Sequence, residues 1–381
     1  MFPLIDVDFD QASHAVAQVR PAAALVSLSG SAGHRLEALA KQIAARKPYL
    51  PLIAVDAAIS LPENAIPFSF EKANSDRLVA RLRGALRVRA LHAMVLRRLG
   101  EPVQAQLPEI DPARDATVLL LGRGGSYPEL SVAFGERMGV VGALSIEAAA
   151  SHLNNRDIDG IVLGEGFTPR VVDAFLTVLS EDARFRSLPI VATSGAPVRA
   201  YDLPNLETIS GEPAHVVGHA LPLIRQRAFE AQLSRTLSAI DAKGLLDPRT
   251  GLLTAVAFAR DFTRAVEQSL HDGGTLSVVR YAFDPADERA QLGGARIVSR
   301  LMRQTDFGAA QPDGSVLVVF SDTDLRSSHA IARRLASVMR QTSHGRRGTR
   351  CDPLVTVATL LPTDSAKSLL ARLYEDRRAA S

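Results

Sequence analysis

An α/β fold is the architecture that the sequence predicts. Short apolar segments such as Leu50–Val55 and Thr117–Leu121 alternate with helical segments through much of the chain. This alternation at short spacing is typical of parallel βαβ units, in which a helix carries the chain from one strand to the next. A polar helix at 75–99 and a proline-containing segment at 101–114 interrupt the pattern. We therefore expect the α/β units to form separate domains.

The composition is that of a folded protein with two or three domains. The chain has 381 residues, of which 46% are hydrophobic and 22% are charged, so disorder is not expected. The single cysteine, Cys351, excludes a disulfide framework and a paired-cysteine metal site. A net charge of +3 is too small to indicate nucleic acid as a partner. No apolar run could span a bilayer and residues 1–20 lack the basic start of a signal peptide, so we expect a cytoplasmic protein.

The first two units are expected to alternate strands and helices. In the first, we predict strands at 4–9, 23–28 and 50–55, and helices at 11–19, 37–46 and 75–99. In the second, we predict strands at 117–121, 140–144, 158–163 and 189–193, and helices at 128–137, 146–154, 170–179 and 214–240. Pro222 should interrupt the last helix. Seven arginines on the 75–99 helix favour a solvated face over a binding surface: Arg77, Arg81, Arg83, Arg87, Arg89, Arg97 and Arg98.

The order of elements in residues 115–228 resembles that of a response-regulator receiver, and residues 1–100 resemble a receiver that lacks its first strand. The resemblance implies two receiver-like, flavodoxin-like doubly wound domains, the first of them truncated. Receivers accept a phosphoryl group on an aspartate beside a Mg²⁺ site. That aspartate aligns with Gly164 in the second domain and with Ser27 in the first. We therefore expect pseudo-receivers that pair and dock without phosphate.

The last third of the chain begins with Asp247-Pro248-Arg249-Thr250-Gly251-Leu252, which resembles the D-x-L-T-G-L motif that opens GGDEF (diguanylate cyclase) domains. The expected elements follow that family's order: helix 255–270, strand 276–281, helix to 302, hairpin 311–320, helix 327–341, strand 354–360 and helix 365–378. The resemblance implies a polymerase-palm-like α/β domain in a PleD-like arrangement. The predicted domains are 1–100, 115–228 and 244–381.

The positions that carry catalysis in that family have changed here. Cyclases hold two Mg²⁺ ions with carboxylates, and the metals activate a hydroxyl and neutralise the triphosphate. By resemblance, the metal-binding aspartate falls on Ala282, and the signature hairpin falls on Pro312-Asp313-Gly314-Ser315-Val316. Asp284 keeps the second aspartate of its segment. We therefore expect a degenerate GGDEF domain that is not an enzyme and requires no cofactor and no metal.

Arg303-Gln304-Thr305-Asp306 resembles the family's product-inhibition motif R-x-x-D, and Arg334 matches the second arginine of that pocket. The resemblance implies cyclic di-GMP as the ligand. An arginine can donate two hydrogen bonds to guanine O6 and N7, and an aspartate can accept from the guanine N–H groups. The alternative is a surface ion pair between residues i and i+3 at a helix end.

The expected function is that of a non-catalytic cyclic di-GMP receptor and signalling adaptor, with Arg303, Asp306 and Arg334 as the binding residues. It resembles the PopA-type adaptors, which implies protein partners recruited through the receiver-like domains, a homodimer, cell-cycle control or regulated proteolysis, and recruitment to a cell pole. Two alternatives remain open. One is a pseudo-receiver scaffold that needs no ligand, and the other is a residual diguanylate cyclase.

Overall fold

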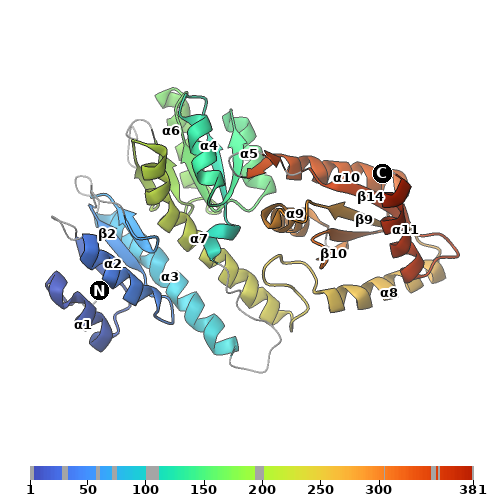
Figure 1. Ribbon diagram of the computed structural model, residues 1–381, viewed down its shortest axis with the longest axis horizontal. Coiled ribbons are helices and arrows are strands. Elements are labelled where there is room, and N and C mark those ends of the chain that lie inside the picture. Colours follow the sequence, from blue (N-terminus) through green and yellow to red (C-terminus); the bar gives the residue numbers. More distant parts are fainter. Residues whose placement is uncertain are drawn as a thin grey trace.

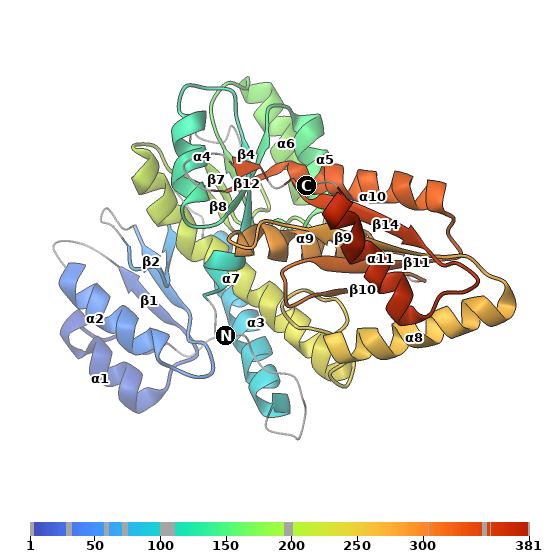
Figure 2. The ribbon, with the colours of Figure 1, turned by 45° about the vertical axis from the view of Figure 1, so that its right-hand side comes forward.

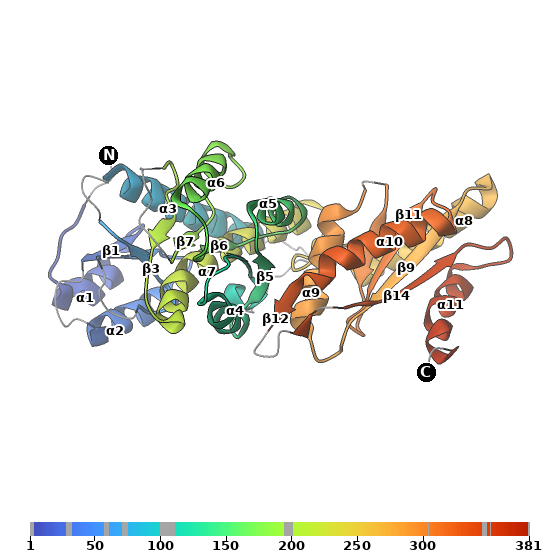
Figure 3. The ribbon, with the colours of Figure 1, turned by 90° about the horizontal axis from the view of Figure 1, so that it is seen from above.

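The computed structural model describes residues 4–27, 33–56, 61–70, 75–99, 111–193, 201–303, 305–344, 349–350 and 352–379. Within these ranges the chain forms three β-sheets, which follow one another along the long axis of the molecule with helices packed against them (Figure 1, Figure 3). The fold is mixed α/β, as predicted. Most of the predicted linker (101–110), Gln304 and Cys351 lie outside the described residues.

The first sheet is parallel, in the order β1-β2-β3, with strands Ala24–Ser27, Leu52–Val55 and Ala65–Phe68. Its helices are α1 (Phe9–Val19), α2 (Gly33–Ala44) and α3 (Ser75–Leu99). The predicted helix at 75–99 is confirmed. The predicted strand at 4–9 is wrong: residues 4–8 form no regular element and α1 begins at Phe9. The side chain of Leu4 is 88% exposed, so this apolar segment has no sheet to pack on.

The second sheet contains five parallel strands in the order β5-β4-β6-β7-β8, the order of flavodoxin-like doubly wound folds. The strands are β4 (Thr117–Leu121), β5 (Gly139–Ala143), β6 (Gly160–Leu163), β7 (Ile190–Ala192) and β8 (Leu206–Thr208). The doubly wound architecture of this unit therefore agrees with the sequence. Its assignment as a receiver stays a prediction.

Helices cover both faces of that sheet. They are α4 (Tyr127–Gly135), α5 (Ile146–Asn155), α6 (Pro169–Glu181) and α7 (Pro213–Asp241). Val118 packs with α4 and α7, whereas Leu119 packs with α5 and α6, because successive side chains of a strand point to opposite faces. The prediction that Pro222 interrupts the last helix is wrong: α7 is continuous and Pro222 is buried inside it.

A buried charge cluster connects the first unit to the second. The guanidinium of Arg81 in α3 donates to Glu207 in β8 at 2.6 Å, and both side chains are 1% exposed. Arg77 donates to the same carboxylate at 3.0 Å. The prediction of a solvated arginine face is therefore wrong for these two residues, because α3 packs along α7 and against the end of the second sheet instead of lying in solvent.

The third sheet is antiparallel, in the order β10-β11-β9-β14. Its strands are β9 (Leu276–Ala282), β10 (Phe307–Ala310), β11 (Val316–Ser321) and β14 (Leu354–Thr359). Helices α9 (Glu288–Leu301) and α10 (Leu325–Arg340) pack on one face, and α8 (Ala255–Asp272) and α11 (Ala366–Ala379) on the other (Figure 2). The predicted order of elements is confirmed. None of the described helices is long and apolar enough to cross a bilayer.

The connection from α10 to β14 leaves its own sheet. Strand β12 (Thr342–His344) pairs antiparallel with β5, and β13 (Thr349–Arg350) pairs with β12, so both extend the second sheet. The sequence did not predict this pairing. It arises from the open N–H and C=O groups along the edge of β5, which are a tertiary feature with no local sequence signal.

Candidate functional site

Arg303 lies directly after α9, where the chain turns towards β10. The helix ends at Leu301, and Met302 caps it in an extended conformation. The side chain of Arg303 is exposed, and its guanidinium makes no hydrogen bond or ion pair with a described residue. Its carbonyl oxygen accepts from the N–H of Asp306 at 3.1 Å, and its backbone also acts on the Asp306 carboxyl group. The motif therefore presents a free cation on a short turn.

Asp306 points inward. It is 8% exposed, and its Oδ1 accepts from the backbone N–H of Ser321, at the end of β11, at 3.3 Å. Burial raises the pKa of Asp306, and the Ser321 N–H and the charge of Arg303 partly oppose that effect. Arg303 and Asp306 form no ion pair within 4.0 Å, although the charge of Arg303 still acts on the carboxyl group. The carboxylate therefore holds the turn against β11 and so fixes the position of the Arg303 backbone.

Arg334 lies on a different element, the middle of α10. Its neighbours Leu335 and Ala336 are buried against α9 and the sheet, and Arg334 itself is exposed. Within the described part of the chain its guanidinium has no hydrogen-bonding or ion-pair partner, Arg303 included. Arg303 and Arg334 thus lie on separate elements of the last unit, and neither is paired with a described residue. The assignment of Arg303, Asp306 and Arg334 to a ligand stays a prediction.

The turn between β10 and β11 contains residues 312–316, on which the sequence resemblance places the signature hairpin of GGDEF domains. The N–H of Gln311 donates to the carbonyl of Ser315 at 2.8 Å, and Gly314 has a φ of 77°. Both Ser315 N–H and Ser315 Oγ donate to Asp313 Oδ1, at 3.0 and 2.6 Å. The turn is therefore held by its own polar groups in a conformation that favours glycine.

Arg280, in the middle of β9, is a residue that the sequence analysis missed. Its buried guanidinium donates to Asp313 Oδ2 at 2.8 Å and to Ser315 Oγ at 3.3 Å, and it stacks on the ring of Tyr374 at 4.6 Å. Burial acts to raise the pKa of Asp313, but the hydrogen bonds from Ser315 and Arg280 outweigh it and lower that pKa. A charged residue inside the apolar run of β9 was the available signal.

Ala282 ends β9 and pairs with Leu354 of β14. The nearby Asp284 uses Oδ1 to accept from the N–H of Ala286 at 2.9 Å, and its carbonyl oxygen accepts from Gln291 at 3.0 Å. The side chain of Asp284 therefore shapes the turn that leads into α9.

The motif at 247–252 that opens the last unit is a compact loop at the interface, here called the seam, between the second and the last unit. Thr250 Oγ1 donates to Asp247 Oδ2 at 2.7 Å, and Gly251 has a φ of 77°. Arg249 of this loop makes two 3.0 Å hydrogen bonds to the carboxylate of Asp115 and a third to Glu288. The loop thus fastens α9 to the short 3₁₀ helix η1 (Pro112–Asp115) of the second unit.

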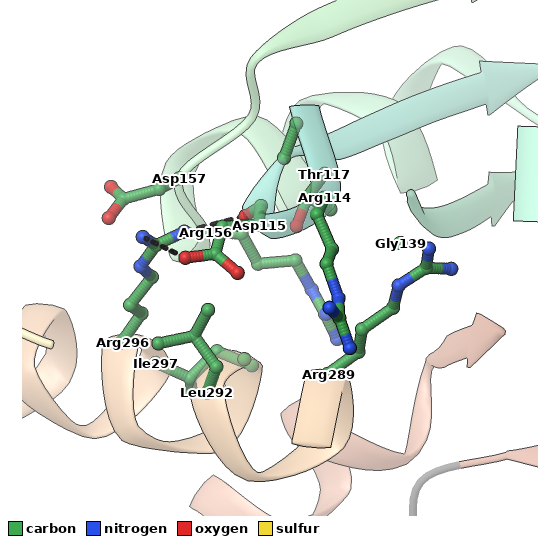
Figure 4. A pocket seen from close by; sticks show the side chains of 12 residues that line it. Arg114, Asp115, Thr117, Gly139, Arg156, Asp157, Arg289, Leu292, Arg296 and Ile297 are labelled. Atoms are coloured by element: carbon green, nitrogen blue, oxygen red, sulfur yellow. Dashed lines mark hydrogen bonds and ion pairs between the residues drawn. The ribbon is translucent and has the colours of Figure 1, made fainter. Parts of the chain in front are cut away.

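The seam itself is lined by arginines. Arg296 of α9 donates to the carbonyls of Asp115 and Arg249, at 2.6 and 3.0 Å. Arg289 donates to the carbonyls of Gly135 and Arg137, both at 2.9 Å. Figure 4 shows these side chains, with Arg114 and Arg156, around a pocket of about 30 Å³. That volume holds a water molecule and not a nucleotide.

Solved structures similar to this chain are GGDEF domains. The GGDEF domain of DgcB from Caulobacter crescentus, in complex with c-di-GMP, is 16% identical, with a TM-score of 0.31, and the match covers 36% of this chain and 89% of that one. The FimX GGDEF domain from Pseudomonas aeruginosa is 17% identical, with a TM-score of 0.32 and coverage of 34% and 90%. The active GGEEF domain of a diguanylate cyclase from Vibrio cholerae is 14% identical, with a TM-score of 0.29 and coverage of 32% and 87%. No protein-family model and no curated protein matches the chain.

These neighbours correct one prediction. The chain was expected not to be an enzyme because Ala282 and the turn at 312–316 depart from the family's catalytic pattern. That expectation is contradicted, since the similar structures include GGDEF domains of diguanylate cyclases, which are enzymes. The substitutions at these positions are facts of the sequence, and a loss of catalysis does not follow from them.

Proposed function

We propose that the chain is a cyclic di-GMP receptor and signalling adaptor that binds the dinucleotide at Arg303, Asp306 and Arg334. The observation that carries the proposal is the exposed Arg303 guanidinium, which has no partner among the described residues, on a turn that the buried Asp306 fixes to β11. A cation held in place without a protein partner is pre-organised to donate to guanine O6 and N7.

Asp306 has two roles in this proposal. Its Oδ1 accepts from the backbone N–H of Ser321, and the backbone of Arg303 also acts on the carboxyl group. Oδ2 is the atom that would accept from the guanine N–H groups. Replacing Asp306 would therefore weaken binding both by losing an acceptor and by releasing the turn that carries Arg303.

Arg334 suggests how the ligand leads to assembly. It is exposed on α10 without a described partner, on an element separate from the Arg303 turn. Cyclic di-GMP has two guanine bases, so it can join Arg303 of one copy to Arg334 of another. A ligand-linked homodimer would then present the first two α/β units to protein partners. In this proposal those partners belong to cell-cycle control or regulated proteolysis, with recruitment to a cell pole.

Titration calorimetry with cyclic di-GMP on the full chain tests the proposal. Arg303→Ala should weaken binding by about 1–3 kcal/mol, the usual value of a bidentate contact between arginine and guanine. Arg264→Ala, at an exposed arginine of α8, is the matched control and should bind as the native chain does. Absence of heat with the native chain would refute the receptor and favour a scaffold that needs no ligand.

A parallel incubation with GTP and Mg²⁺ should accompany the titration, with cyclic di-GMP measured in the product. Any dinucleotide formed by the chain would itself occupy the Arg303 site and lower the apparent affinity. The initial rate of GTP turnover, measured before product accumulates, separates synthesis from binding, and Arg303→Ala reports on binding alone.

A further inference from the structure

A second cavity, larger than the seam pocket, opens beside α7. It has a volume of about 450 Å³ and lies where α5, the α6–β7 connection, α7 and the last turn of α9 meet. Figure 3 shows α5, α7 and α9 close together at this point. A volume of this size is in the range of small-molecule sites. Five arginines line it: Arg156, Arg184, Arg227, Arg235 and Arg300.

The lining carries a surplus of positive charge. Three carboxylates, those of Asp157, Asp159 and Glu230, face the five arginines, which leaves a formal excess of two positive charges. Asp159 is buried, which raises its pKa, and its Oδ2 accepts from the backbone N–H of Thr117 at 2.9 Å. Glu230 is shared between Arg227 at 2.8 Å and Arg87, outside the cavity, at 3.3 Å.

Most of the arginines that line the cavity have partners. Arg184 pairs with Asp182 at 2.7 Å, and Arg300 pairs with Asp157 at 2.5 Å. Arg235 of α7 differs. Its Nε is buried, and its guanidinium has no hydrogen bond or ion pair in the part of the chain that the structure describes. Burial and the neighbouring charge of Arg296 lower the pKa of Arg235 to about 10, against the opposing charges of Asp159, Asp157 and Asp115.

An unpaired guanidinium in such a place is costly. Taking a cation out of water is unfavourable unless an anion and hydrogen bonds replace the lost solvation. Asp159, Asp157 and Asp115 attract Arg235, but none of them forms an ion pair or a hydrogen bond with it among the described residues. The cavity is therefore positively charged, and the described protein groups do not provide Arg235 with an anionic partner.

We infer that this cavity binds a small molecule that carries a phosphate group, with Arg235 as the principal contact and Arg300 and Arg227 at its edge. A phosphate supplies the two negative charges that the lining lacks, and its oxygens match the planar fork of a guanidinium. The cavity leaves space beyond the phosphate for a nucleoside or a second phosphate. This site is separate from the Arg303 turn and does not depend on the function proposed above.

Pyrophosphate is the probe for the test, titrated into the full chain at about 0.15 M salt so that unspecific surface binding is screened. We expect saturable binding that Arg235→Met weakens at least about tenfold, since a hydrogen-bonded charge contact is lost. Arg264→Met, which removes an exposed charge elsewhere, should bind as the native chain does. Methionine keeps the length of the apolar stem, so the melting temperature without ligand should not fall.

A second variant keeps the test informative if Arg235→Met does not fold. Arg300→Gln reaches the cavity from α9 and should also weaken pyrophosphate binding, whereas Arg303→Ala, one turn further along, should not. Competition against bound pyrophosphate by inorganic phosphate, GTP and cyclic di-GMP, with Arg303→Ala as the background, identifies which phosphate compound the cavity prefers. No saturable binding of pyrophosphate at millimolar concentration, or binding that both Arg235→Met and Arg300→Gln leave unchanged, overturns the inference.

Discussion

Arg280 in β9 and Asp313 in the β10–β11 turn form an ion pair of 2.8 Å in which the arginine side chain is 3% exposed and the aspartate side chain 43% exposed. The cost of removing one partner therefore differs between Arg280 and Asp313. Asp313 can be solvated by water if Arg280 is removed, but Arg280 has no route to water if Asp313 is removed. A buried charge left without its partner is the more costly of the two outcomes.

Asp313→Ala should consequently destabilise the protein more than Arg280→Met. Leaving the guanidinium unsatisfied costs roughly 1–3 kcal/mol, whereas methionine fills much of the same volume without a charge. Urea unfolding of both variants and of the native chain, followed by circular dichroism, measures the difference. A greater loss of unfolding free energy in Arg280→Met would show that packing on Tyr374, and not charge, is the main contribution of this residue.

Asp306 should make the stability depend on pH in the opposite sense from an ordinary paired acid. Its folded-state pKa is raised by burial, so the folded state binds the proton more tightly than the unfolded state does. Its ionisation therefore costs stability as pH rises from the unfolded pKa, near 3.9, through the raised folded pKa. Asp306→Asn keeps the oxygen that accepts from Ser321 and removes the titration.

The measurement is the unfolding free energy of the native chain minus that of Asp306→Asn at a series of pH values. This difference should become less favourable to the native chain as pH rises above the unfolded pKa, near 3.9, through the raised folded pKa. A difference that stays constant with pH would mean that Asp306 titrates alike in the folded and unfolded states.

The same region shows what the sequence could and could not predict. The position of Arg303 just after a helix was predictable, because the apolar periodicity of α9 ends before it. The inward orientation of Asp306 was not, since it depends on the N–H of Ser321, fifteen residues away at the end of another strand. Local patterns determine where a helix ends, whereas the partner of a side chain is a property of the folded sheet.

Arg81 also shows that local sequence patterns do not predict the partner of a side chain. An arginine-rich helix indicates a solvated face when only its own periodicity is considered. Here β8, a strand whose residues were not predicted, places Glu207 where it can neutralise Arg81 and Arg77 together. Strand β4 was predicted at its observed bounds because its apolar residues are contiguous and buried on both faces.

Glu207→Gln should therefore cause a large loss of stability. It leaves two arginines, at 1% and 14% side-chain exposure, without a counter-charge, and breaking a buried pair in this way costs about 3–5 kcal/mol. Asp241→Asn is the matched control. It breaks the pair with Arg98, in which both side chains are more than 40% exposed, and should cost about 0–1 kcal/mol. Equal losses in urea unfolding would place Arg81 in a hydrated environment.

Two glycines of the last unit should respond to alanine with opposite signs. Gly314 has a φ of 77°, where an L-residue costs about 1–2 kcal/mol, and an added Cβ would lie 2.4 Å from Cδ of Gln291. Moving Gln291 aside would also break its hydrogen bonds to the carbonyls of Asp284 and Pro285. Gly293 lies inside α9 with no atom within 4 Å of an added Cβ, so alanine should stabilise the helix by up to about 1 kcal/mol. Thermal unfolding should therefore show a lower midpoint for Gly314→Ala and an equal or higher one for Gly293→Ala; a higher midpoint for Gly314→Ala would mean that the turn does not hold the left-handed conformation in solution.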